Sequence, residues 1–131
     1  MNSEILFRFL LASFIIISGV TVYYLYNRLS LSRAPKNSFW GSGKPAILYF
    51  TTPGCMPCKT VQRPAIRQIS EILGEKLEVI EIDASQQPDV AQRWGVLSVP
   101  TTFVIDSRGQ VRHVNHGVAR AEKLLEQLHE L

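Results

Sequence analysis

The stretch that decides the fold reads FTTPGCMPCK, residues 50–59, and places two cysteines three positions apart. Residues 46–50, before it, form a short apolar run between Pro45 and Pro53, which predicts a buried central strand. Residues 51–54 predict a turn, and a helix is expected to begin at the cysteines. Residues three apart in a helix share a face. Both sulfurs therefore lie on one side and can form a dithiol or a disulfide without a large backbone movement.

The start of a helix is a favourable place for a reactive cysteine. Unpaired N–H groups and a partial positive charge there stabilise a thiolate, whereas an ordinary thiol is only about 3% ionised at pH 7. We interpret Cys55 as the nucleophile that attacks a disulfide and Cys58 as the resolving thiol. Pro57 suits the first helical turn. Lys59 either adds positive charge to this site or is an ordinary solvated helix residue.

Two other uses of the cysteine pair stay open. His113 and His116 provide the remaining ligands for a Cys₂His₂ zinc site, but the gap from Cys58 is far longer than in zinc fingers. Residues three apart on a strand also point to opposite faces, which disfavours that site. A purely structural disulfide would close a very small loop and constrain little of the unfolded chain.

The rest of the chain after residue 45 predicts alternating strands and helices. The first helix carries Pro64 in its interior, which should kink it, and ends at Gly74. Further strands are expected at 77–82, 101–105 and 110–115, with a short helix at 86–94 and a final amphipathic helix from Ala121. The order is β-α-β-α-β-β-α. The helical crossover favours parallel pairing of the first two strands, and the short link at 107–109 predicts a terminal antiparallel hairpin.

The N-terminal residues differ in character from the rest of the chain. No charged residue occurs from Phe9 to Tyr26, and eighteen residues in a helix span about 27 Å, close to the thickness of a bilayer core. Three tyrosines gather at one end of this run, where aromatic rings favour the headgroup region. We interpret residues 1–29 as a membrane anchor. A cleaved signal peptide and a buried core helix are the alternatives.

The flanks of the anchor give its orientation. Arg8 precedes the apolar run, whereas Arg28, Arg33 and Lys36 follow it, so the positive-inside rule places the following domain in the cytoplasm by a margin of two charges. An extracytoplasmic domain is the alternative. Residues 30–44 are rich in Ser, Gly and Pro and are predicted to form a linker. Its Phe39-Trp40 pair is expected to dock on the domain or at the membrane interface.

Composition limits the remaining possibilities. The chain has 131 residues, of which 46% are hydrophobic and 19% charged, with a formal net charge of +3. This length suits one folded domain. The mild charge and the lack of a basic run argue against a nucleic-acid partner.

Residues 45–131 resemble the thioredoxin family. The resemblance rests on residues 50–59, the internal Pro64, the Val99-Pro100-Thr101-Thr102 segment, the turn at 106–110 and Gly117 before the last helix. It implies a thioredoxin-like α/β fold. The family's first strand and helix have no counterpart between the anchor and Pro45, so we expect a trimmed four-stranded mixed sheet flanked by helices and preceded by the transmembrane helix.

The resemblance also implies specific roles. The Val99–Pro100 peptide bond is expected to be cis and to lie against the cysteine pair, with Val99, Pro100 and Gly117 binding an extended substrate. Tyr49 stands where the family has a buried acid that helps to deprotonate the resolving thiol, and a phenol is a poor base near neutral pH. We hypothesise that Glu81 takes over as proton acceptor. His116, beside Gly117, is a candidate for stabilising the Cys55 thiolate or contacting substrate.

The sequence therefore predicts a membrane-tethered thiol–disulfide oxidoreductase that reduces or exchanges protein disulfides. The absence of insertions between Cys55 and Pro100 favours a general thioredoxin-like reductase. Beyond the Cys55–Cys58 disulfide itself we expect no cofactor and no metal. The expected partners are protein disulfides, an electron donor such as a thioredoxin reductase or a membrane thiol carrier, and lipid around residues 9–26. A non-catalytic client-binding module and a zinc-binding structural domain are the alternative functions.

Overall fold

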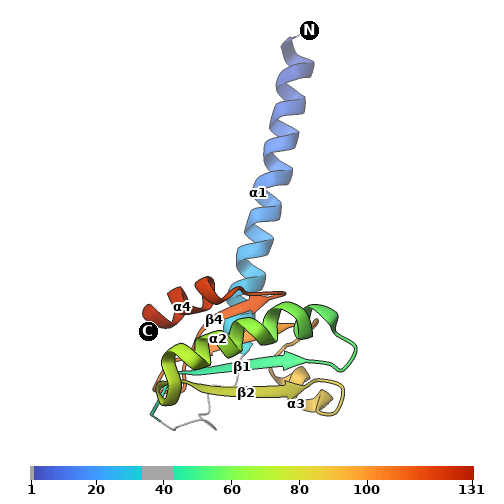
Figure 1. Ribbon diagram of the computed structural model, residues 1–131. Coiled ribbons are helices and arrows are strands. Elements are labelled where there is room, and N and C mark those ends of the chain that lie inside the picture. Colours follow the sequence, from blue (N-terminus) through green and yellow to red (C-terminus); the bar gives the residue numbers. More distant parts are fainter. Residues whose placement is uncertain (1, 34–42) are drawn as a thin grey trace.

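The computed structural model describes residues 2–33 and 43–131, which form one long helix and an α/β domain (Figure 1). The elements in chain order are α1 (Asn2–Arg33), β1 (Ala46–Thr51), a π-helical turn η1 (Cys58–Gln62), α2 (Arg63–Leu73), a 3₁₀ turn η2 (Gly74–Lys76), β2 (Glu78–Asp83), α3 (Pro88–Arg93), β3 (Thr101–Ile105), β4 (Val111–His116) and α4 (Ala121–His129). The predicted order of strands and helices is confirmed.

The sheet of the described domain has four strands in the order β2-β1-β3-β4. β1 pairs with β2 in parallel, as the helical crossover predicts, whereas β1–β3 and β3–β4 are antiparallel. All six residues of β1 are buried because strands and helices cover it on every side. This explains why its sequence is continuously apolar instead of alternating. The carboxyl end of this central strand leads directly into the cysteine motif.

Two apolar clusters hold the sheet, one on each face. On one face, Ile47 and Tyr49 of β1 pack with α2 and α4 through residues such as Ile69 and Leu124. On the other face lie Ala46, Leu48, Phe50, Ile82, Ala91, Trp94, Phe103 and Ile105, where α3 supplies the helical layer. Phe103 packs edge to face against both Phe50 and Trp94, with the Trp94 and Phe103 centroids 4.9 Å apart, whereas the Phe50 and Trp94 rings are tilted. The core is thus two-sided, and it fixes the direction of β1.

The helix that carries the cysteines is not a regular α-helix throughout. Its first segment, Cys58–Gln62, is a π-helical turn that closes with the Arg63 N–H bonded to the Cys58 carbonyl. Pro64 follows, and proline can donate no backbone hydrogen bond to the preceding turn. A π-helical turn is one way for a helix to accommodate such a break, and these turns are common at functional sites. The sequence predicted a kink at Pro64, and the structure identifies the local irregularity as this turn.

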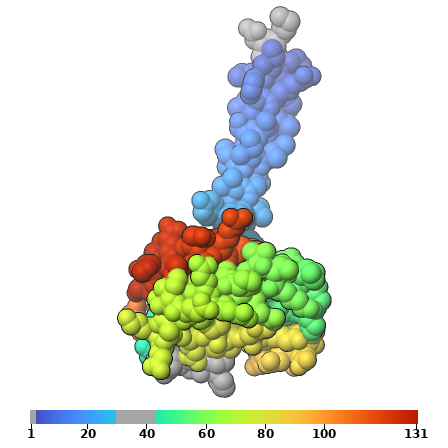
Figure 2. All heavy atoms as spheres, in the orientation of Figure 1, coloured from blue at the N-terminus to red at the C-terminus, as the bar shows by residue number. Residues whose placement is uncertain are grey.

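Helix α1 is longer than the predicted anchor. It continues to Arg33, so the start of the linker predicted at residues 30–44 is corrected: residues 30–33 are helical. Ser3–Leu29 is long and apolar enough to cross a membrane, and none of it is buried in the protein. A signal sequence would pass the same test, whereas the exposure excludes the core-helix alternative. Figure 2 shows α1 projecting away from the domain.

Three predicted element bounds shift by one or two residues. The strand predicted at 77–82 occupies 78–83, and the helix predicted at 86–94 is shortened to 88–93, with Pro88 in its first turn, where no N–H is needed. The strand predicted at 110–115 occupies 111–116 because Gln110 belongs to the preceding turn. There the Asp106 carboxylate accepts the N–H groups of Arg108 and Gln110, each at 2.9 Å.

Candidate active site

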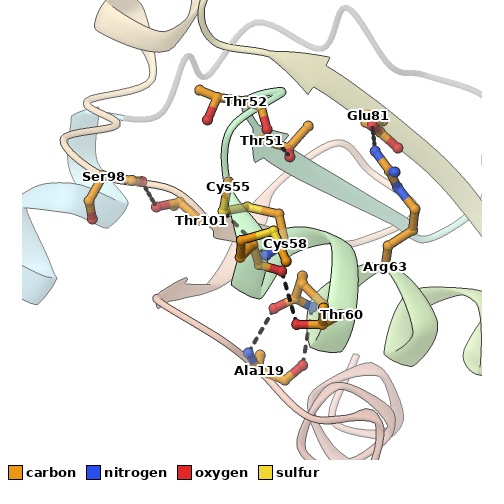
Figure 3. Close-up of a disulfide and its surroundings, with 12 residues drawn as sticks. Thr51, Thr52, Cys55, Cys58, Thr60, Arg63, Glu81, Ser98, Thr101 and Ala119 are labelled. Carbon is orange, nitrogen blue, oxygen red and sulfur yellow. Dashed lines mark hydrogen bonds and ion pairs between the residues drawn. A yellow bond between two sulfur atoms is a disulfide. The ribbon is translucent and has the colours of Figure 1, made fainter.

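Cys55 and Cys58 form a disulfide at the point where β1 passes into the helix (Figure 3). The turn is closed by the Cys55 N–H, which donates to the Thr52 carbonyl at 3.1 Å. Cys55 retains 8% of its surface, whereas Cys58 is fully buried. The backbone N–H of Cys58 donates to the Cys55 sulfur at 3.2 Å. A donor in this position also stabilises a thiolate on Cys55 once the disulfide is reduced.

Two loops flank the disulfide. One carries Val99 and Pro100, whose peptide bond is cis, as the resemblance implied. The other follows β4, where the Gly117 N–H donates to the Pro100 carbonyl at 2.8 Å and joins the two loops. Figure 3 shows Thr101 between Cys55 and Ser98, with the Thr101 hydroxyl donating to the Ser98 carbonyl at 2.7 Å. The three segments predicted to form the site are therefore adjacent in space.

Exposed apolar side chains come from each of these segments. Met56, between the cysteines, is 62% exposed, Leu97 before the cis proline is 78% exposed, and Val118 after Gly117 is 42% exposed. Val99 is half-buried and Pro100 is buried. The surface around the disulfide thus offers apolar contacts together with loop backbone.

Tyr49 of β1, Glu81 of β2 and Arg63 of α2 lie close to one another near the cysteine helix. Tyr49 is buried, and its hydroxyl forms no hydrogen bond within the described residues. Glu81, its register partner on β2, accepts a hydrogen bond from Arg63 at 2.7 Å. This hydrogen bond is the main reason that the pKa of Arg63 is raised. The nearby Tyr49 phenol also raises it, although its hydroxyl is not placed to form a hydrogen bond. The Glu81 carboxylate therefore faces Arg63 (Figure 3), and its role as proton acceptor stays a prediction.

The two histidines of β4 point to opposite faces of the sheet. The His113 Nε2 lies 3.1 Å from a Glu130 carboxylate oxygen just beyond α4, whereas the His116 ring packs on Tyr26 of α1 at 5.4 Å between centroids. A Cys₂His₂ zinc site that uses both imidazoles is incompatible with this arrangement. Burial lowers the pKa of His116. A lowered pKa favours the neutral imidazole near pH 7.

Comparison with known proteins identifies the fold and the family. The thioredoxin family model matches residues 36–130. The chain belongs to the thioredoxin family. It is 33% identical over 88 residues to a thioredoxin-like protein of Synechocystis, covering 67% of this chain and 82% of that protein. It is 28% identical over 100 residues to thioredoxin of Bacillus subtilis, covering 75% of this chain and 94% of that protein.

Solved thioredoxin structures share the fold. Thioredoxin of Fasciola hepatica matches with a TM-score of 0.60 at 22% identity, over 69% of this chain and 83% of that one. Chloroplastic thioredoxin z matches with a TM-score of 0.64 at 19% identity, over 71% of this chain and 82% of that one. The chain thus carries a thioredoxin-family oxidoreductase-like domain with a close cysteine pair, and membership implies protein disulfides as substrates at a general level.

Two further predictions from the sequence concern Lys59 and the Phe39-Trp40 pair. Lys59 is exposed on the cysteine helix, which suits the solvated interpretation as well as the tuning one. The Phe39-Trp40 pair lies outside the described residues.

Sequence reasoning missed Gln62, Arg63 and Tyr26. Gln62 follows Cys58 by four positions, which places it on the buried face of the same helix. A glutamine at that position of an otherwise apolar face was the available signal. Arg63 and Tyr26 gave no such signal, because their partners come from distant parts of the chain.

Proposed function

We propose that this protein is a membrane-tethered thiol–disulfide oxidoreductase that reduces or exchanges disulfides in client proteins. The observation that carries the proposal is the unequal burial of the two cysteines at the helix start. Cys55 is partly accessible and faces a backbone N–H donor, whereas Cys58 is fully buried behind it. An attacking thiol must reach a client, whereas a resolving thiol needs only to reach Cys55.

The reaction starts from the reduced dithiol. The Cys55 thiolate attacks one sulfur of the client disulfide, so a Cys55–client S–S bond forms while the client S–S bond breaks and its second sulfur leaves as a thiolate. Cys58 then gives up its proton and attacks the Cys55 sulfur, which forms the Cys55–Cys58 disulfide and releases the first client sulfur. The client gains two electrons and the dithiol loses two. A dithiol-class donor returns the enzyme to its reduced form.

The tether is helix α1, with residues 9–26 in lipid. Its apolar surface is exposed over the whole candidate span, and a bilayer is the solvent in which such a surface is stable. The charge asymmetry of the flanks supports a cytoplasmic domain. Reduction followed by labelling of Cys55 in intact cells with a membrane-impermeant thiol reagent tests this. Protection that is lost on lysis supports the cytoplasmic side, whereas labelling of intact cells overturns it.

The chemistry is tested with the full chain in detergent micelles and insulin as the disulfide probe. Dithiothreitol-driven insulin reduction is expected for the unaltered chain and should fall to background in Cys55→Ser. Cys58→Ser should instead accumulate a mixed disulfide with insulin that dithiothreitol releases. If the unaltered chain binds insulin but does not accelerate its reduction, the non-catalytic binding module is the better description.

His116 and Gly117 complete the proposed client site with Val99 and Pro100. The extended client segment would pair with the Val99 backbone, as in other strand-addition modes of peptide binding. A neutral His116 offers the client a hydrogen-bond partner rather than a charge. Titration of Cys55 in His116→Ala is expected to leave the thiol pKa unchanged, and a clear rise would restore the electrostatic role.

A further inference from the structure

The cysteine helix and the loop after β4 are joined by one buried side chain. Gln62 is fully buried at the end of the π-helical turn that starts with Cys58. Its Nε2 donates to the Ala119 carbonyl at 3.1 Å, and the Ala119 N–H donates to its Oε1 at 2.8 Å. One amide therefore satisfies both backbone polar groups of a residue 57 positions away.

Ala119 needs such a partner because no backbone group among the described residues hydrogen-bonds to it. Residues 118–120 belong to no strand or helix, and the following helix α4 begins at Ala121, where the N-cap Arg120 makes no side-chain cap hydrogen bond. Ala119 is buried, so water cannot satisfy its N–H and C=O groups. The small methyl side chain of Ala119 also leaves its backbone open to approach. In Figure 3, Ala119 lies beside the helix that carries the disulfide.

The same loop continues to the proposed client site. Gly117, two residues before Ala119, donates to the Pro100 carbonyl at 2.8 Å. The path from the helix of Cys58 thus has three parts: the Gln62–Ala119 hydrogen bonds, the two peptide bonds back to Gly117, and the Gly117–Pro100 hydrogen bond. Gly117 has φ of +85°, and the exposed Val118 stands next to it. The hydrogen bonds of Gln62 therefore fix the position of Gly117 and Val118 relative to the disulfide.

We propose that Gln62 is a positioning residue for client binding, acting through Ala119. By fixing residues 117–120 it keeps the loop beside the disulfide ordered before a client arrives, so binding does not have to order the loop. A small disulfide needs only to collide with Cys55 and gains nothing from an ordered loop. This inference rests on the proposed function, because it concerns how that site binds a protein client.

The test compares two disulfide probes in Gln62→Met, which keeps the side-chain length and removes both hydrogen bonds. With insulin, KM should rise at least about fivefold while kcat stays within about twofold, because loop ordering now opposes binding. With hydroxyethyl disulfide, the rate constant should stay within about twofold. Amide hydrogen exchange at Gly117 and Ala119 should accelerate in the same variant.

The matched control is Gln127→Met. Gln127 forms an equivalent reciprocal amide pair with Asn115, at 2.8 and 3.0 Å, but joins β4 to α4. Its removal should lower the melting temperature without changing the ratio of the two substrate rates. If Gln62→Met does not fold, Gln62→Glu replaces it, since Glu keeps the acceptor for the Ala119 N–H but sets a carboxylate oxygen against the Ala119 carbonyl. A rise in KM, still confined to insulin, is then expected.

Several results would overturn the inference. An unchanged KM for insulin in the Gln62 variants contradicts the inference. An equal loss of rate with insulin and with hydroxyethyl disulfide also contradicts it, because this marks a merely structural role. An equal rise of the insulin KM in Gln127→Met has the same meaning. If the unaltered chain reduces neither probe, the proposed function fails and the inference fails with it. If the unaltered chain reduces both and only the Gln62 effect is missing, the inference fails alone.

Discussion

Tyr49→Phe tests what the buried hydroxyl of the central strand does. Tyr49 is 1% exposed, and its hydroxyl has no hydrogen-bond partner in the described domain. An unsatisfied buried hydroxyl costs about 1–3 kcal/mol, and the electrostatic contact with Arg63 offsets part of that cost. We therefore expect Phe, which keeps the ring, to stabilise the domain by about 1 kcal/mol. For a domain of this size that raises the melting temperature by about 4–8 °C.

The assay is thermal unfolding of the unaltered chain and the variant in the same micelles, followed by circular dichroism. The same pair of proteins is used to follow decay of the Cys55–insulin mixed disulfide after rapid acid quenching. Because a phenol is normally protonated near neutral pH, loss of the hydroxyl should leave the resolving rate within about twofold. If Tyr49→Phe lowers the unfolding free energy by about 1 kcal/mol or more, the Tyr49 hydroxyl has a hydrogen-bond partner. If the variant resolves the mixed disulfide more slowly, the hydroxyl is part of the proton path from Cys58.

Three further predictions follow from other contacts. If Glu81 accepts the Cys58 proton, Glu81→Gln should slow the resolving step several-fold in the quenched mixed-disulfide assay, and an unchanged rate would remove that role. The same substitution breaks the half-exposed ion pair with Arg63, which should change the unfolding free energy by less than about 1 kcal/mol. Gly117→Ala should cost about 1–2 kcal/mol in urea unfolding, because φ is +85° although an added Cβ would meet nothing within 4 Å; an unchanged midpoint would show that the loop relaxes. Burial holds the pKa of His116 below its ordinary value of 6.5, so the unfolded chain binds a proton more readily and stability falls as the pH drops below 6.5. Melting temperatures measured from pH 7.5 to 5 should fall less in His116→Gln than in the unaltered chain, and parallel curves would contradict this.

Local patterns in the sequence were sufficient for most of the secondary structure. Residues 46–50 are apolar without interruption, which is the pattern of a strand buried on both faces, and β1 is such a strand. The end of the cysteine helix at Gly74 was predictable because positive φ is easy only for glycine, and Gly74 has φ of +54°. The bounds that shifted depend on side-chain contacts, such as the Asp106 carboxylate that keeps Gln110 in the turn.

Some features of the candidate active site were likewise predictable from local sequence, whereas others depend on tertiary contacts. The spacing of Cys55 and Cys58 after a strand was enough to predict that they can form a disulfide, because helical geometry alone brings residues three apart together. The partners of Glu81 and His116 were not predictable, since Arg63 and Tyr26 reach them only after the chain has folded. The unequal burial of the two cysteines also depends on the packed helix and on both flanking loops.

The sequence by itself determined the reactive pair, the order of elements and the apolar N-terminal helix, because each depends on residues close together along the chain. Only the tertiary structure decided that Arg63 engages Glu81, that His113 and His116 face opposite sides of the sheet, and that Gln62 clamps Ala119. These contacts join residues far apart in sequence. Their formation depends on how helices cover the two faces of the sheet, and no local pattern encodes that arrangement.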